Sequence, residues 1–208
     1  MKQRNIVILK VVSWLACLEP ALLLLYKFSI HDLGPNPIEF VTLTTGTATL
    51  VLLLVTLAIT PVRKLTGLTW LIKFRRLTGL FAFFYAALHF TTFIWLDKFF
   101  DWEEISRDLT KRPFIIVGFV AFLLMVPLAL TSTAWSIRKL GGKRWNLLHR
   151  LIYVSAVLGV IHFWWKVKAD HFEPAVYGII LALLLLARVA IWAYSKAQKP
   201  ASGALKKD

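Results

Sequence analysis

The sequence predicts an all-α protein, an integral membrane bundle of six transmembrane helices with both termini in the cytoplasm. Of its 208 residues, 58% are hydrophobic and only 17% are charged, and the mean hydropathy is +0.67. A soluble domain of this length cannot keep so much apolar surface covered. Six apolar segments follow one another, each close to the roughly 20 residues that a helix needs to span the hydrocarbon core. Lys and Arg concentrate in alternate connections, as in chains that cross a membrane repeatedly.

Proline positions agree with these six segments. Pro113 and Pro174 stand just before the fourth and sixth segments, where the missing N–H of proline costs nothing. Thr60-Pro61 is expected to close the second segment. The six predicted helices cover residues 6–28, 40–60, 77–96, 114–130, 147–167 and 175–194.

One membrane domain is expected to fill the chain. The basic start is like that of a signal peptide, but Glu19-Pro20 interrupt the apolar run and no A-x-A site follows, so we predict a retained first helix. Residues 1–39 would form this helix and an outer loop, 40–194 the membrane core, and 195–208 a polar cytoplasmic tail.

The charge distribution predicts the orientation. The chain has 25 Lys and Arg against 11 Asp and Glu, a surplus that in a soluble protein would suggest nucleic acid. Eighteen of the 25 fall on one side of the predicted bundle, which the positive-inside rule assigns to the cytoplasm, so no nucleic acid partner is expected. The outer loops are short and near neutral, so another protein would have to handle any large substrate there. The eighteen lie in the N-terminus, residues 63–76, residues 138–150, and 188–207.

Cysteine content and motifs limit the chemistry. Cys17 is the single cysteine, so no intramolecular disulfide, cysteine-based metal site or dithiol redox couple can form. The sequence contains no G-x-G-x-x-G and no P-loop, so it is not expected to bind a nucleotide by those motifs. Redox chemistry would need a bound cofactor, with electrons supplied from outside the chain.

Two histidines are predicted to meet in the outer half of the membrane. His89 stands thirteen residues above Arg76 on the third helix, and His162 thirteen residues above His149 on the fifth, about 20 Å in each case at 1.5 Å per residue. Ionisable side chains in such helices are costly and usually functional. Two imidazoles at one level on different helices are what bis-histidine heme ligation in a bundle requires. His31 and His171 fall in outer loops and are expected to be solvated.

His149 is predicted to mark a second, inner station. It is too far from His162 to share a heme, and an ideal helix would turn the two side chains about 140° apart. Arg75 and Arg76 stand at its level on the third helix. These arginines could hold propionates or a flavin phosphate through charge-assisted bonds, or they could anchor the chain to anionic lipid.

Several stretches of the sequence resemble a known family, the heme-binding membrane subunits MsrQ (formerly YedZ) of bacterial protein-methionine-sulfoxide reductases. This family is part of the ferric-reductase-like transmembrane group, which also contains NADPH oxidases and STEAP reductases. The likeness runs from about residue 40 to 194. The stretches are TPVRK (60–64), FRRLTGL and AALHFTTF (within 74–93), TKRPF and LTSTAW (within 110–135), RKLGGKRWNLLHRLIY (138–153) and IHFWWKVK (161–168).

The resemblance implies a function and partners. It implies a b-type heme, with the histidines of the family falling on His89, His149 and His162, and it also implies FMN. It further implies electron transfer from a cytosolic flavin reductase or the quinone pool, across the bacterial inner membrane, to the periplasmic molybdoenzyme subunit MsrP, which repairs oxidised methionine in proteins. The chain departs from the NADPH-oxidase pattern in having one histidine on the third helix, so a second bis-histidine heme is not implied.

Two other functions are compatible with the residues themselves. A reductase of the STEAP or NADPH-oxidase type would pass electrons to ferric iron or oxygen, although this chain carries no nucleotide-binding motif to feed them. A proton-coupled transporter could use Glu19 and the histidines as a relay.

Overall fold

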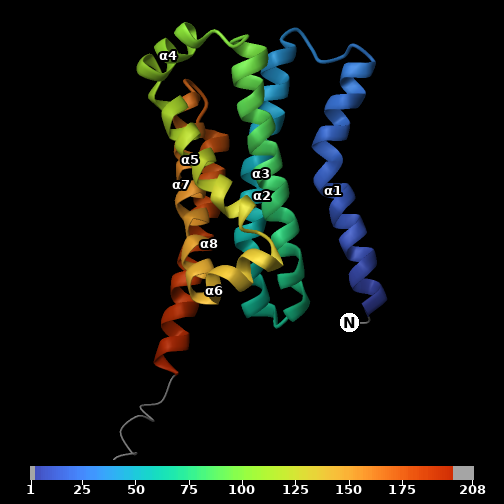
Figure 1. The fold of residues 1–208 in the computed structure, drawn as a ribbon, viewed down its shortest axis with the longest axis vertical. Helices are drawn as coiled ribbons and strands as arrows, with labels where there is room; N and C mark the ends of the chain where they lie inside the picture. The colour runs from blue at the N-terminus through green and yellow to red at the C-terminus, as the bar shows by residue number, and fades with distance from the viewer. Residues whose placement is uncertain (1–2, 199–208) are drawn as a thin grey trace, which may run out of the picture.

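The computed structural model describes residues 3–198, and every regular element in that range is helical (Figure 1). Six candidate spans are long and apolar enough to cross a membrane, which confirms the predicted all-α class of six transmembrane helices; the cytoplasmic placement of both termini stays a prediction. They are α1 (Gln3–Ser29), α2 (Pro37–Thr66), η1 (Thr69–Phe74) continued by α3 (Arg75–Thr91) and η2 (Thr92–Asp97), α5 (Pro113–Leu130), α6 (Ala134–Leu148) with α7 (Leu151–Lys166), and α8 (Phe172–Ala197).

The second helix does not close at Thr60-Pro61 as predicted. α2 continues through Pro61 to Thr66 and ends where Gly67 adopts a left-handed conformation (φ 72°). A proline inside a helix leaves the carbonyl four residues earlier without its N–H partner. Here the guanidinium of Arg188, on α8, donates to that carbonyl of Leu57. Because a neighbouring helix satisfies the freed group, the helix can pass the proline.

The fifth predicted helix, residues 147–167, is also interrupted. α6 ends at Leu148, the chain turns at His149 and Arg150, and α7 begins at Leu151. Figure 1 shows α6 lying across the end of the bundle while α7 runs along it. The basic residues 138–150, expected in a loop, are therefore mostly helical. The helical rotation used to separate His149 from His162 does not apply, because the two residues do not share a helix.

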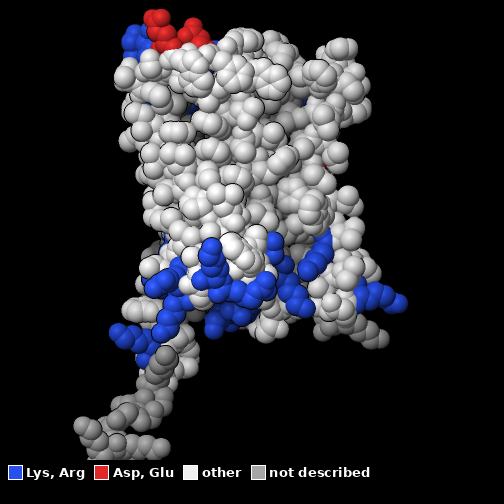
Figure 2. All heavy atoms as spheres, in the orientation of Figure 1, with Lys and Arg blue, Asp and Glu red and all other residues white. Residues whose placement is uncertain are grey.

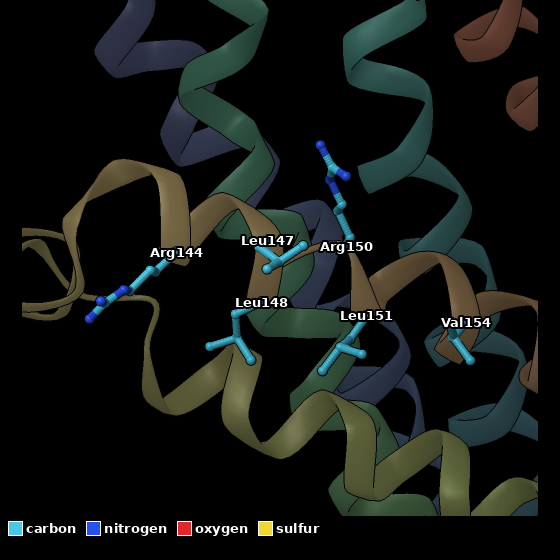
Figure 3. Close-up of a pocket in the computed structure, with 6 residues that line it drawn as sticks. All are labelled: Arg144, Leu147, Leu148, Arg150, Leu151 and Val154. Carbon is cyan, nitrogen blue, oxygen red and sulfur yellow. The ribbon is translucent and has the colours of Figure 1, made fainter.

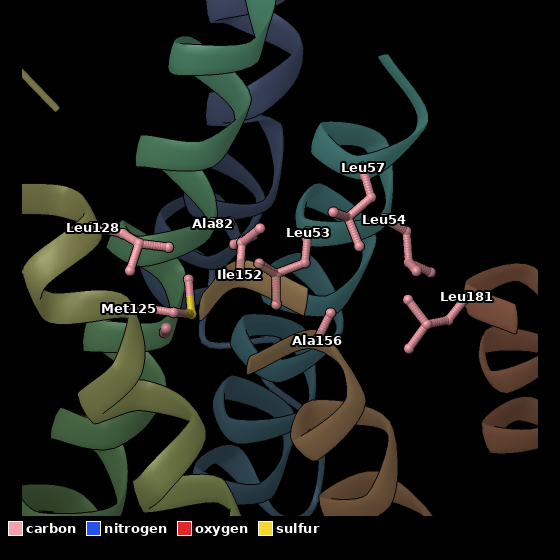
Figure 4. Close-up of a cluster of buried hydrophobic side chains, with 10 residues drawn as sticks. Leu53, Leu54, Leu57, Ala82, Met125, Leu128, Ile152, Ala156 and Leu181 are labelled. Atoms are coloured by element: carbon pink, nitrogen blue, oxygen red, sulfur yellow. The ribbon is translucent and has the colours of Figure 1, made fainter. Parts of the chain in front are cut away.

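One cluster of buried apolar residues joins five of the spans (Figure 4). Its small residues Ala82 on α3 and Ala156 on α7 have no exposed surface, and small side chains let membrane helices approach closely. α1 contributes no residue to this cluster; its Cys17 belongs to a second one, with Ala48 of α2 and Phe81 and Tyr85 of α3. The first cluster consists of Leu53, Leu54, Leu57, Ala82, Ala86, Met125, Leu128, Ile152, Ala156 and Leu181.

Charge separates the two ends of the molecule. Figure 2 shows Lys and Arg in a band at the end where the chain begins and α6 lies, while Asp and Glu appear at the opposite end, near α4 (Trp102–Lys111). Nine of the eleven carboxylate residues of the sequence fall in the connections at that opposite end or in the adjoining turn of a span. The asymmetry is the one expected if the basic end faces the cytoplasm. We call the two ends the inner and outer ends.

A buried ion cluster fixes the outer connection between η2 and α5. Lys98 is 5% exposed, and its Nζ lies 2.6 Å from Glu104 Oε1 and 2.8 Å from Asp108 Oδ2. Burial acts to lower the pKa of Lys98, but the hydrogen bonds to Asp108 and Glu104 and the charge of Asp97 outweigh it and raise this pKa above the ordinary lysine value. The cluster therefore ties α4 to the end of the His89 helix.

We expect Lys98→Met to loosen α4 by about 1.5–3 kcal/mol, because a charged hydrogen bond to Glu104 and an ion pair with Asp108 are lost. Faster amide hydrogen exchange in α4 would report the loosening. Because the folded pKa of Lys98 is raised, the lysine contribution should be complete below the unfolded pKa and fade only as pH rises through the folded one. Exposed Lys111→Met is the matched control and should leave exchange unchanged. Unaltered α4 exchange in Lys98→Met would contradict this account.

Candidate cofactor-binding site

The structure brings His89 of α3 and His162 of α7 together. Their ring centres lie 6.0 Å apart, with the ring planes at 88°. A metal–imidazole bond is about 2 Å long and the ring centre lies about 1 Å beyond the nitrogen, so two imidazoles on opposite sides of one metal have centres about 6 Å apart. Perpendicular ring planes are compatible with this, because each imidazole would bind the metal along its own metal–nitrogen axis, whatever the angle between the two ring planes. The spacing of the pair thus fits two axial ligands of one metal.

Each of these imidazoles is held through Nδ1 by a main-chain carbonyl. His89 Nδ1 lies 3.0 Å from the carbonyl oxygen of Thr42 on α2, and His162 Nδ1 lies 2.7 Å from that of Phe114 on α5. A carbonyl can only accept, so in the neutral ring Nδ1 carries the proton and Nε2 keeps a lone pair. Metal-ligating histidines characteristically have this second hydrogen bond. The two rings therefore present Nε2 as the free ligand atom.

Two glycines that sequence reasoning missed make these contacts possible. A Cβ on Gly46 would lie 3.1 Å from His89 Cε1, and one on Gly118 would lie 2.5 Å from His162 Nδ1. Each glycine follows by four residues the residue whose carbonyl accepts the bond, Thr42 or Phe114. The same arrangement thus occurs twice, on α2 and on α5. The available signal was a lone glycine inside each apolar helix, where glycine is otherwise unfavourable.

No third protein ligand stands beside the pair. Within residues 3–198 no group of three or more His, Cys, Asp or Glu side chains is placed to bind a metal. A metal between His89 and His162 would need its remaining ligands from a non-protein group. A porphyrin supplies four such ligands in one plane and leaves the two axial positions to imidazoles.

His149 lies apart from this pair, at the turn between α6 and α7. Its Nδ1 is 3.0 Å from the carbonyl oxygen of Trp145, and its ring stacks on the Trp145 indole at 3.7 Å between centres. The indole is itself fixed, because its Nε1 donates to the carbonyl of Thr131 at 2.9 Å. His149 Nε2 is buried without a partner in the described part of the chain. A buried polar atom of this kind indicates a ligand position.

His149, Arg75 and Arg76 line one cavity of about 380 Å³ near the inner end. The sequence predicted that these three residues share a level, and the structure brings them to one site, separate from the His89–His162 pair. No carboxylate belongs to the lining, so the cavity favours an anionic group. The other lining residues are Thr56, Ile72, Gly79, Leu80, Phe83, Met125, Leu128, Ala129, Ser132, Ile137, Trp145, Asn146 and Ile152.

A second hollow lies on the surface of α6 and α7, near the inner end, and contains none of the predicted site residues (Figure 3). Leucines form its floor, and in Figure 3 the guanidinium groups of Arg144 and Arg150 point away from them. Leu147, one of its residues, is 64% exposed. An open apolar surface at the inner end of a span is what lipid contact requires, so we assign it no cofactor.

Comparison with known proteins agrees with the class that this architecture defines. Residues 45–160 match the family described as ferric reductase like transmembrane component. The match covers more than half of the chain, includes His89 and His149, and ends two residues before His162. The protein is therefore a multi-pass membrane protein of the ferric-reductase-like class.

Individual relatives define the family more closely. The chain is 57% identical over 175 residues to a protein of Herminiimonas arsenicoxydans named protein-methionine-sulfoxide reductase heme-binding subunit MsrQ, covering 83% of this chain and 80% of the relative. Proteins of the same name from Ralstonia nicotianae (48% identical, 94% and 92% covered) and Rhodospirillum rubrum (50%, 86% and 86%) match as well. The chain belongs to the MsrQ family.

We expect Gly118→Ala to destabilise the fold by about 1–3 kcal/mol, because the added methyl would overlap the His162 ring in a packed interior. Thermal unfolding of the purified protein would measure the loss. Gly159→Ala is the matched control, since its Cβ would meet only Leu50 at 3.8 Å. Equal unfolding temperatures for the two variants would show that Gly118 is not needed for its contact.

Proposed function

We propose that this protein is a b-type heme electron-transfer subunit of a methionine sulfoxide reductase system in the bacterial inner membrane. Electrons would come from a cytosolic flavin reductase or the quinone pool and leave to a periplasmic molybdoenzyme subunit, MsrP. The observation that carries the proposal is the His89–His162 pair, with both Nε2 atoms free and the ring centres 6.0 Å apart. The relatives are named heme-binding subunits, which supports the proposal.

In this proposal His89 and His162 would hold the heme through their Nε2 atoms. When bound there, the heme supplies a one-electron redox centre whose potential depends on its ligands and on burial. The carbonyls of Thr42 and Phe114 hold the ligand rings in one tautomer and one orientation. A b-type heme is retained by coordination and packing, and Cys17, the single thiol, packs against Tyr85 and not against the histidine pair.

Aromatic side chains near the pair would keep water out. Phe90 stacks on Phe119 and Phe122 with ring centres 5.4 and 4.9 Å apart, and Phe83 stacks on Phe122 at 5.8 Å. These rings join α3 to α5, from Phe90 next to His89 to Phe83 in the lining of the inner cavity. A dry, rigid interior suits electron transfer, which needs fixed distances more than motion.

The inner cavity is proposed to hold a second redox group or its acidic substituent. Arg75 and Arg76 would bind propionates or the phosphate of FMN through charge-assisted bonds, and His149 Nε2 would offer a metal ligand or a hydrogen-bond acceptor. FMN rests on the resemblance to the family. The cavity favours either group through its positive lining, and the alternative role, binding an anionic lipid headgroup, uses the same arginines.

The histidine substitutions separate the two sites. We expect His89→Ala or His162→Ala to abolish the heme absorbance of the purified protein, because one axial ligand is lost in each case. His149→Ala should keep most of this absorbance and slow reduction from the cytosolic side. His171→Ala, in the outer connection, is the control. Full heme content and electron flow in all three site variants would refute the scheme.

The proposed orientation can be tested with introduced thiols, because Cys17 is buried. Ser106 on α4 and Thr66 at the inner end of α2 are both exposed. In intact cells a membrane-impermeant maleimide should label Ser106→Cys and not Thr66→Cys, and lysis should make both reactive. Labelling of Thr66→Cys alone in intact cells would invert the proposed direction of electron transfer.

A further inference from the structure

The corner that the chain forms between α6 and α7 has two faces. Trp145, His149 and Ile152 belong to the lining of the inner cavity. Other residues of the same corner line the separate hollow of Figure 3, whose volume is about 510 Å³. The two linings share no residue, so the corner separates the inner cavity from the hollow. The hollow is lined by Arg144, Leu147, Leu148, Arg150, Leu151 and Val154.

The floor of the hollow is apolar and faces the surroundings of the bundle. Leu147 is 64% exposed, and Val154, in the first turn of α7, is 48% exposed. In Figure 3 the three leucines and the valine follow one another along the corner. α6 and α7 belong to one of the candidate membrane spans. An acyl chain is therefore the apolar partner that the bilayer offers to this floor.

Two arginines stand at the rim of this floor. Both Arg144 and Arg150 are exposed, and neither forms an ion pair among residues 3–198. In Figure 3 their guanidinium groups point away from the leucines, as expected of long basic side chains that reach for lipid headgroups. α7 also begins here, at Leu151, without a side-chain cap, and a helix N-terminus favours a negative group. Because no carboxylate lines the hollow, its rim fits an anion.

α6 places the hollow at the depth of the lipid headgroups. The helix lies across the inner end of the bundle (Figure 1), where Figure 2 shows the band of Lys and Arg. Its Trp135 is 61% exposed, as is typical of tryptophan at a membrane interface, and Lys139 Nζ lies 4.7 Å from the centre of that ring. α6 carries four basic residues and no carboxylate. This composition is typical of helices that bind anionic lipid.

We propose that the hollow binds one anionic phospholipid, with an acyl chain along the leucine floor and the phosphate beside Arg144 and Arg150. The site needs an apolar chain and a negative charge in one molecule, and a lipid of the phosphatidylglycerol type has both. A zwitterionic lipid lacks the net charge, and free phosphate lacks the chain. The inference goes beyond the proposed function, because it requires neither a heme nor an electron donor.

A lipid in the hollow would support the corner that carries His149. Leu148 and Leu151 stand on either side of the turn at His149 and Arg150, and both line the hollow. An acyl chain packed against these leucines would therefore limit opening of the turn. Because His149 faces the inner cavity from the other side of the same turn, the lipid would also hold its imidazole in place.

Native mass spectrometry of the full-length protein, released from nanodiscs of equal parts phosphatidylglycerol and phosphatidylcholine, tests the binding. The wild type should retain phosphatidylglycerol in preference. Arg144→Gln and Arg150→Gln should each weaken this retention about fivefold, the size expected for one basic residue beside anionic lipid. Leu147→Ser should weaken it through the floor. Lys64→Gln is the matched control, because it removes an exposed charge at the inner end outside the hollow.

Amide hydrogen exchange tests the effect on the corner. In the wild type, exchange of residues 147–152 should be slower in phosphatidylglycerol than in phosphatidylcholine nanodiscs. The double variant Arg144→Gln/Arg150→Gln should lose this difference, while unchanged exchange in α4 shows that its fold is kept.

Equal retention of the two lipids would overturn the inference. So would an equal loss in Lys64→Gln, which would indicate general charge attraction, or removal of the lipid by added inorganic phosphate, which would indicate a site for a free anion. A protein that shows the lipid preference but holds no heme would refute the proposed function and leave this inference standing.

Discussion

The site depends on one constraint: an imidazole in a bilayer interior must have its Nδ1 proton bonded before its Nε2 can act as a ligand. His89 and His162 satisfy it in the same way, by donating to a carbonyl of a neighbouring helix that is already part of that helix's own ladder. The imidazole can reach such a carbonyl only if the residue four positions after the carbonyl, on the same helix, has no side chain. Gly46 and Gly118 stand at those positions. The donor and acceptor are 47 residues apart in one case and 48 in the other. The same arrangement of histidine, carbonyl and glycine therefore occurs in the helix pairs α2–α3 and α5–α7. The two histidines meet because these two helix pairs pack together.

Sequence reasoning could predict what depends on hydrophobic length and on rise per residue. Six spans, the common level of His89 and His162, and the grouping of His149 with Arg75 and Arg76 all follow from counting along helices. The errors occur where a tertiary contact overrides a local signal. Pro61 should end a helix, but Arg188 satisfies the carbonyl that it frees. His149 should continue the helix of His162, but the chain turns there and α6 lies across the inner end. The glycines escaped attention because their role exists only against a ring on another helix.

The two ends of the bundle differ in the regularity of the backbone that carries their site residues. The outer pair is presented by regular helices, so its separation is set by helix packing and is stiff. The inner cavity lies where backbone regularity fails: η1 is a 3-10 helix that contributes Ile72, and the turn after α6 contributes His149. Irregular backbone at membrane depth is tolerated where it is buried in protein or lines a cavity. The inner end thus contains a ligand-sized cavity, whereas at the outer end helix packing fixes the distance between the His89 and His162 imidazoles.

The arrangement of positive charge follows from the same difference. Arg188 carries a guanidinium into the inner half of α8, where its Nη1 bonds Tyr153 Oη at 2.8 Å and its Cζ lies 5.2 Å from the centre of that ring. No carboxylate pairs with it among the described residues. Within hydrocarbon a cation is tolerated when carbonyl and aromatic groups surround it, and here they come from α2 and α7. Arg75, Arg76 and Arg188 therefore give the inner half a positive potential without neutralisation by the protein. An electron or an anionic group is stabilised there relative to the lipid around it, whereas at the outer pair the charge of Lys166 lies close enough to act on both imidazoles.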